Sequence, residues 1–488
     1  MTIFSKRRTL LFALAARLGT SFIFFAPDIA VGQSTSPVAK LEATRLSGPA
    51  PLAVMFDATG TTGPADLDTF RELTYEFNFG DDRGLTWEHS GLPRNTQSGG
   101  PLAAHVFDAP GDYTVVMRVA APGGGSSEAS LKITVEDPNS VYPGEKTVCV
   151  SPSGKYDGCP NGALRETMLP RTYAGKRVLM NRGESFGIVS INRNNDGIVI
   201  GSYGSGTKPI VENVLINSGR FNDKFTDDLV IMDLDILDGL VHMGTGSRYL
   251  IYRNNLTHPG GNNMIEIAGA LSYLAQENPK IYFYSPREIF IVDNVVRGQV
   301  NNIQKPLANL VGLGAYFAII GNDMSHAEQH TMRLYGVHKG FVAHNALRGM
   351  SYGGEPGGTG GSIRSVMKIH SDGLLPYEDD WSKTKGKWAT RQLVIADNLM
   401  GDRNNNGFFT AGVAPQNRDV GTVEGIEDVI IERNRFIRGP FTNTEMENVG
   451  RRIVTRGNTR VDGGVPNLSI GQPSPSLPKE WFGPYYRQ

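Results

Sequence analysis

Seven short segments of this chain share one pattern, a run of β-branched and other apolar residues that ends in asparagine. The segments are LIYRN to Asn254, FIVDN to Asn294, AIIGN to Asn322, FVAHN to Asn345, VIADN to Asn398, IIERN to Asn434 and VTRGN to Asn458. Each predicts a strand that stops at a turn, where a short amide side chain can hydrogen-bond the backbone or adopt a left-handed conformation. The steps between these asparagines are 40, 28, 23, 53, 36 and 24 residues. A unit of roughly 23 to 28 residues, lengthened by insertions, predicts a solenoid of β-coils with an internal ladder of stacked amides.

A different alternation marks residues 38–136, ahead of the repeat. Apolar residues occupy every second position in TYEFNFGDD (74–82) and HVFDAPGDYTVVMRV (105–119), with Gly and Asp at the turns. Short strands of this kind predict a β-sandwich that buries alternate side chains between two sheets. The expected fold class is therefore all-β, with an N-terminal sandwich followed by a solenoid.

The sandwich motifs resemble the PKD domain, an immunoglobulin-like module of exported proteins. The resemblance is carried by Tyr75, Phe77, Phe79, Gly80 and Asp81, and by Gly111, Tyr113 and Val115. Phe77 stands where the family usually has Trp, and we expect the smaller ring to fill the same core position. The resemblance implies a spacer or adhesive module with weak contacts to carbohydrate or protein, and no catalytic cluster lies in this segment.

The repeat domain is expected over residues 142–466, after a linker at 137–144 that contains two prolines. Its first coils are RVLMNRGESF (177–186) and GIVIGSYGSG (197–206). Their shape resembles the right-handed parallel β-helix of the pectate lyase-like superfamily, which implies the same architecture here. Residues 467–488 are rich in Pro and aromatic residues, and we expect an irregular tail.

The first 32 residues predict a secretory signal, because basic Lys6, Arg7 and Arg8 precede apolar stretches and a small-residue site at Gly32. The paired arginines also fit a twin-arginine export signal. An uncleaved anchor is the alternative, but Arg17 leaves the apolar run short of the roughly 20 residues that a spanning helix needs. We expect a secreted or periplasmic monomer without a stable membrane span.

Composition and the cysteines narrow the class of protein further. The 59 glycines and 28 prolines favour a turn-rich β protein. With 48 basic and 49 acidic residues the net charge is −1, which gives no argument for nucleic acid as a partner. In an exported protein, the pair Cys149 and Cys159 predicts one disulfide that closes a small loop, with two buried free thiols as the alternative.

Counting back from the asparagines identifies residues of one register. His242 precedes Asn254 by twelve residues, and Arg333 precedes Asn345 by twelve. A shared offset predicts that His242 and Arg333 lie on one sheet, where equivalent residues of successive coils are about 4.8 Å apart. A column of outward polar side chains on such a sheet is a candidate binding surface.

The strand pattern extends this column, since each further member also lies between two apolar residues. The predicted order is His242, Glu266, a weakly defined coil near Leu310, Arg333 with Tyr335, and Lys368 with His370. Elimination across a uronic acid needs a neutralised carboxylate and a base for the C5 proton. Arginine can clamp a carboxylate with two hydrogen bonds, and a lysine beside another cation can lose its proton near neutral pH.

The Arg333/Lys368 pair resembles the Lys/Arg pairs of β-helical alginate and chondroitin lyases. The resemblance implies β-elimination on an acidic, uronate-containing polysaccharide. Arg333 would neutralise the carboxylate, Lys368 or His330 would take the proton, and Tyr335 or His370 would assist the leaving oxygen. In those families the lysine strand comes first, so the reversed order here leaves the assignment of base and acid open.

Further candidates surround the column. SHAEQHTMRLYGVHKG (325–340) is rich in histidine, and we expect substrate-binding roles for His242, Glu266, His338, Trp381 and Trp388, the two tryptophans lying in an insertion at 371–389. No cofactor is certain; calcium that bridges a substrate carboxylate to Glu266 is a candidate. Zinc at His326 and His330 fits poorly, because a strand separates residues four apart.

Other functions fit the same fold. A glycoside hydrolase needs two carboxylates, which the acidic residues of the insertion could supply, but the Gly-His-Gly motif of β-helical polygalacturonases is absent. A uronate epimerase and a non-catalytic, glycan-binding surface protein are the remaining alternatives.

Overall fold

The computed structural model describes most of the chain from residue 36 onward. The described residues are 36–192, 195–217, 226–238, 241–242, 246–258, 264–267, 287–298, 308–327, 330–348, 366–371, 390–401, 408–413, 426–437, 446–448, 451–466 and 468–470. The predicted signal at residues 1–32, Trp381 and Trp388 lie outside them. Within these ranges, no helix combines the length and the apolar composition that crossing a membrane requires.

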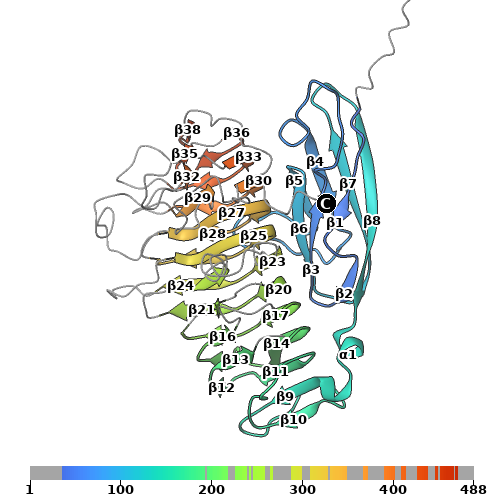
Figure 1. The fold of residues 1–488 in the computed structure, drawn as a ribbon, viewed down its shortest axis with the longest axis vertical. Helices are drawn as coiled ribbons and strands as arrows, with labels where there is room; N and C mark the ends of the chain where they lie inside the picture. Colours follow the sequence, from blue (N-terminus) through green and yellow to red (C-terminus); the bar gives the residue numbers. More distant parts are fainter. Residues whose placement is uncertain are drawn as a thin grey trace, which may run out of the picture. The chain divides into compact units, whose positions relative to one another are not determined.

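The N-terminal strands form the two sheets of a sandwich (Figure 1). One sheet has the order β1 (Glu42–Ala43), β3 (Leu52–Asp57), β6 (Leu102–Phe107). The other has the order β2 (Ser47–Pro49), β8 (Ser126–Glu136), β7 (Gly111–Ala120), β4 (Thr74–Asn78), β5 (Thr96–Gly99). The predicted alternation is present, since Tyr75 and Phe77 of β4 are buried and its other residues are exposed. Phe77 thus lies in the core, as expected.

From Thr147 onward, strands of successive coils pair in parallel and form three stacks, as Figure 1 shows. The first stack contains β9 (Thr147–Val150), β11 (Arg177–Asn181), β14 (Ile198–Tyr203), β17 (Leu229–Met232), β20 (Ser247–Tyr252), β23 (Arg287–Val292), the later parts of β25 (Ala308–Ile320) and β27 (His330–Ala343), β30 (Thr390–Ala396), β33 (Ile426–Glu432) and β36 (Arg451–Arg456). The second contains β12 (Ser185–Phe186), β15 (Ile210–Val211), β18 (Asp235–Ile236), β21 (Asn255–His258), β24 (Val295–Gly298), β26 (Asp323–Ser325), β28 (Ala346–Leu347), β31 (Leu399–Met400), β34 (Arg435–Phe436) and β37 (Thr459–Arg460).

The third stack contains β13 (Val189–Asn192), β16 (Val214–Asn217), β19 (Val241–His242), β22 (Ile265–Ile267), the early parts of β25 and β27, β29 (Met367–Ser371), β32 (Phe408–Val413), β35 (Met446–Asn448) and β38 (Leu468–Ile470). Apolar side chains from all three stacks meet in one long core. The chain is therefore a sandwich followed by a parallel β-helix.

The first strand of the β-helix, β9, lies within the range of 142–466 expected for the repeat domain, ahead of the first coils named from the sequence. At the other end, β38 pairs with β35 just past residue 466. The short β10 (Leu164–Glu166) pairs with β9. The predicted linker at 137–144 holds α1 (Pro138–Val141), and the 3₁₀ turn η1 (Gly144–Lys146) begins at its last residue.

The asparagine ladder is present between the first and second stacks. From Asn294 to Asn458, each ladder asparagine accepts hydrogen bonds at its Oδ1 from the backbone N–H and the side-chain amide of the one before it. All except Asn458 are fully buried. Of the two roles expected for the amide, hydrogen bonding to the backbone is the one observed. The left-handed residue is the one before the asparagine, with φ between 52° and 69° at Arg253, Asp293, Gly321, His344, Asp397, Arg433 and Gly457.

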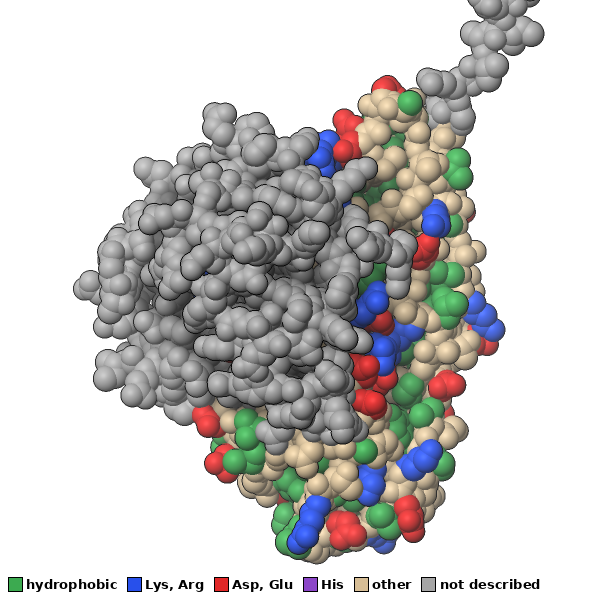
Figure 2. All heavy atoms as spheres, in the orientation of Figure 1, with side chains coloured by type: hydrophobic (Ala, Val, Ile, Leu, Met, Phe, Trp, Pro, Cys, Tyr) green, Lys and Arg blue, Asp and Glu red, His purple; other side chains and the backbone are tan. Residues whose placement is uncertain are grey.

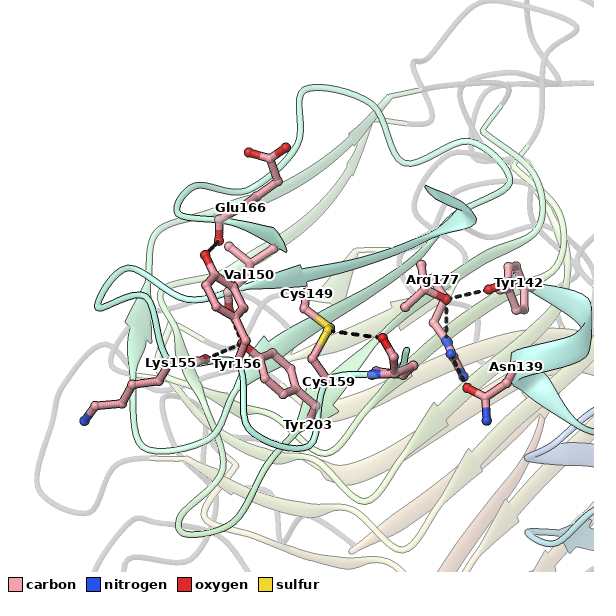
Figure 3. The surroundings of a disulfide bond; sticks show 12 residues. Asn139, Tyr142, Cys149, Val150, Lys155, Tyr156, Cys159, Glu166, Arg177 and Tyr203 are labelled. Carbon is pink, nitrogen blue, oxygen red and sulfur yellow. Dashed lines mark hydrogen bonds between the residues drawn. A yellow bond between two sulfur atoms is a disulfide. The ribbon is translucent and has the colours of Figure 1, made fainter. Parts of the chain in front are cut away.

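A disulfide joins Cys149 and Cys159, as predicted (Figure 3). Cys149 is fully buried in β9 and packs with Leu179 and Tyr203 of the next two coils. The Tyr203 hydroxyl donates to the carbonyl of Lys155 at 2.8 Å. The loop closed by the disulfide is thereby held against the N-terminal end of the β-helix.

Candidate functional site

The predicted polar column lies along the third stack. His242 pairs with Glu266, Glu266 with Val311, Val311 with Arg333, and Arg333 with Lys368. The register inferred by counting back from the asparagines is therefore the register of the sheet. Val311, beside Leu310, occupies the coil that the sequence defined weakly.

Alternation within each strand directs the column away from the core. The neighbours of Glu266, Arg333 and Lys368 along their strands, Ile265, Ile267, Met332, Leu334, Met367 and Ile369, are all fully buried. Glu266 and Arg333 are half-buried, and Lys368 is 9% exposed. In a strand, successive side chains lie on opposite faces, so the three polar residues share the outer face. Neighbouring strands are about 4.8 Å apart, which brings Arg333 and Lys368 into adjacent positions.

Tyr335 and His370 also pair, two positions beyond Arg333 and Lys368. The backbone thus places them in the same outer register, while their side chains lie outside the described atoms, as does the side chain of His242. Trp381 and Trp388 lie outside the described residues altogether.

The column continues through residues that sequence reasoning missed. Lys368 pairs with Phe409, Phe409 with Glu447, and Glu447 with Ser469. Long insertions separate these strands in the sequence, so counting back from the next asparagine fails. FFTAGV (408–413) is apolar at both Phe408 and Phe409, so its pattern carries no signal that would have located Phe409 on the column.

His330 does not share the face of Arg333. It lies three residues earlier on β27, in the inward register of Met332 and Leu334, and is 4% exposed. The period of two along a strand directs its side chain to the opposite face. The structure therefore does not place His330 on the face of Arg333, where it was expected as the alternative base to Lys368.

The histidine-rich segment is divided between different environments. His338 lies beyond a register shift, in the part of β27 that belongs to the first stack, and its Nε2 lies 3.2 Å from Gln392 Oε1. It is 4% exposed, and burial lowers its pKa to about 3. His338 therefore lies in the first stack, away from the column, and its substrate-binding role stays a prediction. His344 directly precedes the ladder asparagine Asn345, and its ring stacks on Trp87 of the sandwich. Burial lowers the pKa of His344 to about 4.

The described residues contain no group of three or more His, Cys, Asp or Glu side chains arranged to hold a metal ion. Calcium at Glu266 stays a prediction. Figure 2 shows acidic and basic side chains side by side on the visible described surface. Because the net charge of the whole chain is −1, attraction of an anionic ligand would depend on a local group of cations.

Comparisons with known proteins give a family match for the sandwich and distant structural similarities for the chain as a whole. Residues 39–135 match the model of the PKD domain. A search of curated proteins finds no match.

Three solved structures illustrate what the chain is similar to. PfbA, a surface adhesin of Streptococcus pneumoniae, is 12% identical over 61% of this chain and 84% of its own, with a TM-score of 0.34. The A-module of the Azotobacter vinelandii mannuronan C-5 epimerase AlgE6 is 13% identical over 64% and 88%, with a TM-score of 0.27. A Yersinia enterocolitica family 28 exopolygalacturonase is 9% identical over 87% and 86%, with a TM-score of 0.31. The chain carries a PKD domain at residues 39–135, followed by a parallel β-helix.

Proposed function

We propose that the column of the third stack binds an acidic polysaccharide and cleaves it by β-elimination. The observation that supports this is the pairing of Arg333 with Lys368 on neighbouring strands. Both side chains belong to the outer face, and they are the two cations of the described column. A uronate carboxylate needs such a charge beside it before its C5 proton becomes acidic.

The proposed roles follow from the chemistry of each group. The Arg333 guanidinium binds the uronate carboxylate through two hydrogen bonds. The Lys368 amine takes the C5 proton, the electrons of that C–H bond form the C4–C5 double bond, and the C4–O bond breaks. Tyr335 or His370 gives a proton to the departing oxygen. The product is a shortened chain and an unsaturated uronate.

The spacing of carboxylates in the column argues against hydrolysis there. Among the column residues that the structure describes, Glu266 and Glu447 are the two carboxylates, and five strand pairings separate them. At about 4.8 Å for each pairing, their strands are roughly 24 Å apart. Glycosidases hold their two carboxyl groups about 5 to 9.5 Å apart. A hydrolase would therefore need acids from outside this column.

The test is incubation with alginate, pectate, glucuronan and glycosaminoglycans while ultraviolet absorbance of the unsaturated product is recorded. Lys368→Ala and Arg333→Ala should each lower the rate by about 10²-fold or more, as loss of a general base or of an electrostatic stabiliser does. Thr257→Ala, at an exposed position of the second stack, is the matched control and should leave the rate unchanged.

Three outcomes would contradict the proposal. Saturated sugars would indicate hydrolysis, inversion at C5 without cleavage would indicate epimerisation, and binding without turnover on any polyuronate would indicate a glycan-binding surface protein. Circular dichroism and thermal unfolding of each variant check that a lost rate is not a lost fold.

A further inference from the structure

Seven left-handed residues precede the ladder asparagines, along the corner between the first and second stacks, and the first six of them face the sandwich. We call Arg253, Asp293, Gly321, His344, Asp397 and Arg433 the corner row. If this corner faced solvent, its polar residues would need no protein partners. Instead, every member of the corner row contacts the sandwich, and five of the six do so through polar groups.

The polar contacts follow the row in order. Arg253 donates to Asp108 Oδ1 at 3.3 Å. The Asp293 carboxylate accepts two hydrogen bonds from Arg94, at 2.5 and 3.1 Å. Further along, Gln97 donates to Asp397 Oδ2 at 3.3 Å, and Arg433 donates to the carbonyl of Ser98 at 2.7 Å.

One segment of the sandwich, residues 87–98, makes most of these contacts. Its Trp87 ring stacks on His344, with the ring centroids 5.0 Å apart and the planes 7° from parallel. His344 is held on both ring nitrogens, by Ser90 Oγ at 2.8 Å and by Gln97 Oε1 at 2.8 Å. The Arg94 guanidinium also lies over the Trp87 ring, 4.2 Å from a ring centroid.

Gly321 allows the backbone of the corner row to approach Trp87 closely. A Cβ at this position would lie 2.7 Å from the Trp87 ring and 2.5 Å from Asp293 Oδ1. The backbone of the β-helix therefore approaches the indole as closely as a residue without a side chain permits.

Apolar contacts continue this surface over the outer face of the first stack. Leu250, Tyr252, Phe290, Val292, Phe341, Val394 and Ile430 are buried there with Met55, Leu102 and Val106 of the sandwich. The outer face of a strand stack that meets water should carry polar residues in alternation. The first stack carries apolar ones on both faces, which is the pattern of a strand buried on both sides.

We infer that the PKD domain is a fixed wall of the β-helix, docked on the corner row and on the outer face of the first stack, and that it is not the mobile spacer or adhesive module that its family resemblance implies. The docked sandwich covers the outer face of the first stack over β20, β23, β25, β27, β30 and β33, so ligands can reach these coils only at their other faces. This inference does not depend on the proposed enzymatic activity.

The test uses the full chain with a protease recognition sequence inserted between Pro143 and Gly144, both exposed. The single disulfide lies wholly on the C-terminal side of the cut, so no covalent bond joins the two fragments after cleavage. We expect the cut protein to elute from gel filtration as one species, at the volume of the uncut protein, and to stay intact over a hundredfold dilution.

Variants of the same cleavable chain identify the surface responsible. Trp87→Ala and Arg94→Ala should each raise the separated fraction at least tenfold at a given dilution. Lys132→Ala, whose side chain is 63% exposed on β8, should not raise it. Circular dichroism of the uncut variants checks their folding. Separate elution of the fragments of the parent chain would overturn the inference, and so would equal retention of both fragments in the Trp87 and Lys132 variants.

Discussion

At the scale of single residues, the ladder asparagines use both ends of the amide in the core. The Oδ1 of Asn345 accepts from the backbone and side chain of Asn322, and its Nδ2 donates to the carbonyls of Ile319 and Ala343 and to Asn398 Oδ1, all at 2.9 Å. Neither aspartate nor leucine supplies a donor and an acceptor at the same place. Each rung therefore satisfies backbone groups that the turn would otherwise leave buried and unpaired.

Asn345→Ala should strongly destabilise the protein. The substitution leaves the Asn322 N–H and two carbonyls without this hydrogen-bond partner, and a buried polar group without a partner costs about 1–3 kcal/mol. We expect the free energy of unfolding in urea to fall by roughly 3 kcal/mol or more. Asn458→Ala is the matched control, because this last described rung is half-buried and should cost less than about 1.5 kcal/mol. Equal losses in both variants would contradict a cooperative internal ladder.

At the scale of elements, two strands join the candidate site to the docked sandwich. β25 and β27 each run through the third stack and on into the first, with a register shift between Gly312 and Gly314 of β25. β27 carries Arg333 in its early part and Phe341, which packs against the sandwich, in its later part. Between them, Lys339 forms an ion pair with the buried Asp57 of the sandwich. The strand that bears the proposed carboxylate-binding residue is thus anchored at its other end.

Gly321→Ala tests the turn that faces the sandwich. Both Gly321 and Gly457 have left-handed backbones, with φ of 69° and 63°, so alanine strains either position by about 1–3 kcal/mol. At Gly457 the nearest atom to an added Cβ is Arg433 Cγ at 3.3 Å, whereas at Gly321 the indole lies at 2.7 Å. We expect Gly321→Ala to lower the free energy of unfolding by about 1–3 kcal/mol more than Gly457→Ala, because overpacking adds to the strain. Equal losses in thermal or urea unfolding would show that Trp87 yields freely.

At the scale of the whole molecule, buried histidines should make stability depend on pH. Burial lowers the pKa of His344 to about 4. Nearby, Asp397 favours the charged ring, whereas Arg433 and Arg94 oppose it. It lowers the pKa of His338 to about 3, where Lys339 and Arg391 oppose a further charge and Asp57 favours one. In the unfolded chain both rings should titrate near 6.5. Between these values the unfolded state binds more protons than the folded state.

The contribution of these two histidines to the free energy of unfolding should therefore be fully present above about pH 6.5 and decrease as the pH falls towards 4. Each histidine contributes about 1.4 kcal/mol per pH unit in that window. We expect His344→Gln to reduce the slope of the free energy of unfolding between pH 6 and 5 by about that amount, measured by urea unfolding at several pH values. An unchanged slope would show that His344 takes up protons without unfolding.

The sequence alone determined the strands, the ladder and the register of the column. These depend on the period of apolar residues and on an amide repeated at the end of each strand, and both are local properties of the chain. Because a parallel stack aligns equivalent positions, an equal count back from Asn254 and from Asn345 was enough to place His242 and Arg333 on one sheet. The predicted cysteine pair also needed no more than its spacing and an exported context.

Only the tertiary structure decided which polar residues belong together. His330, His338 and His344 are close in sequence, yet strand alternation and the change from the third stack to the first place them in three environments. The partners of His344 are Ser90 and Gln97, about 250 residues away along the chain. A repeat pattern contains no information on contacts of that separation. The docking of the sandwich therefore follows only from the tertiary structure, in which the outer apolar face of the first stack is covered.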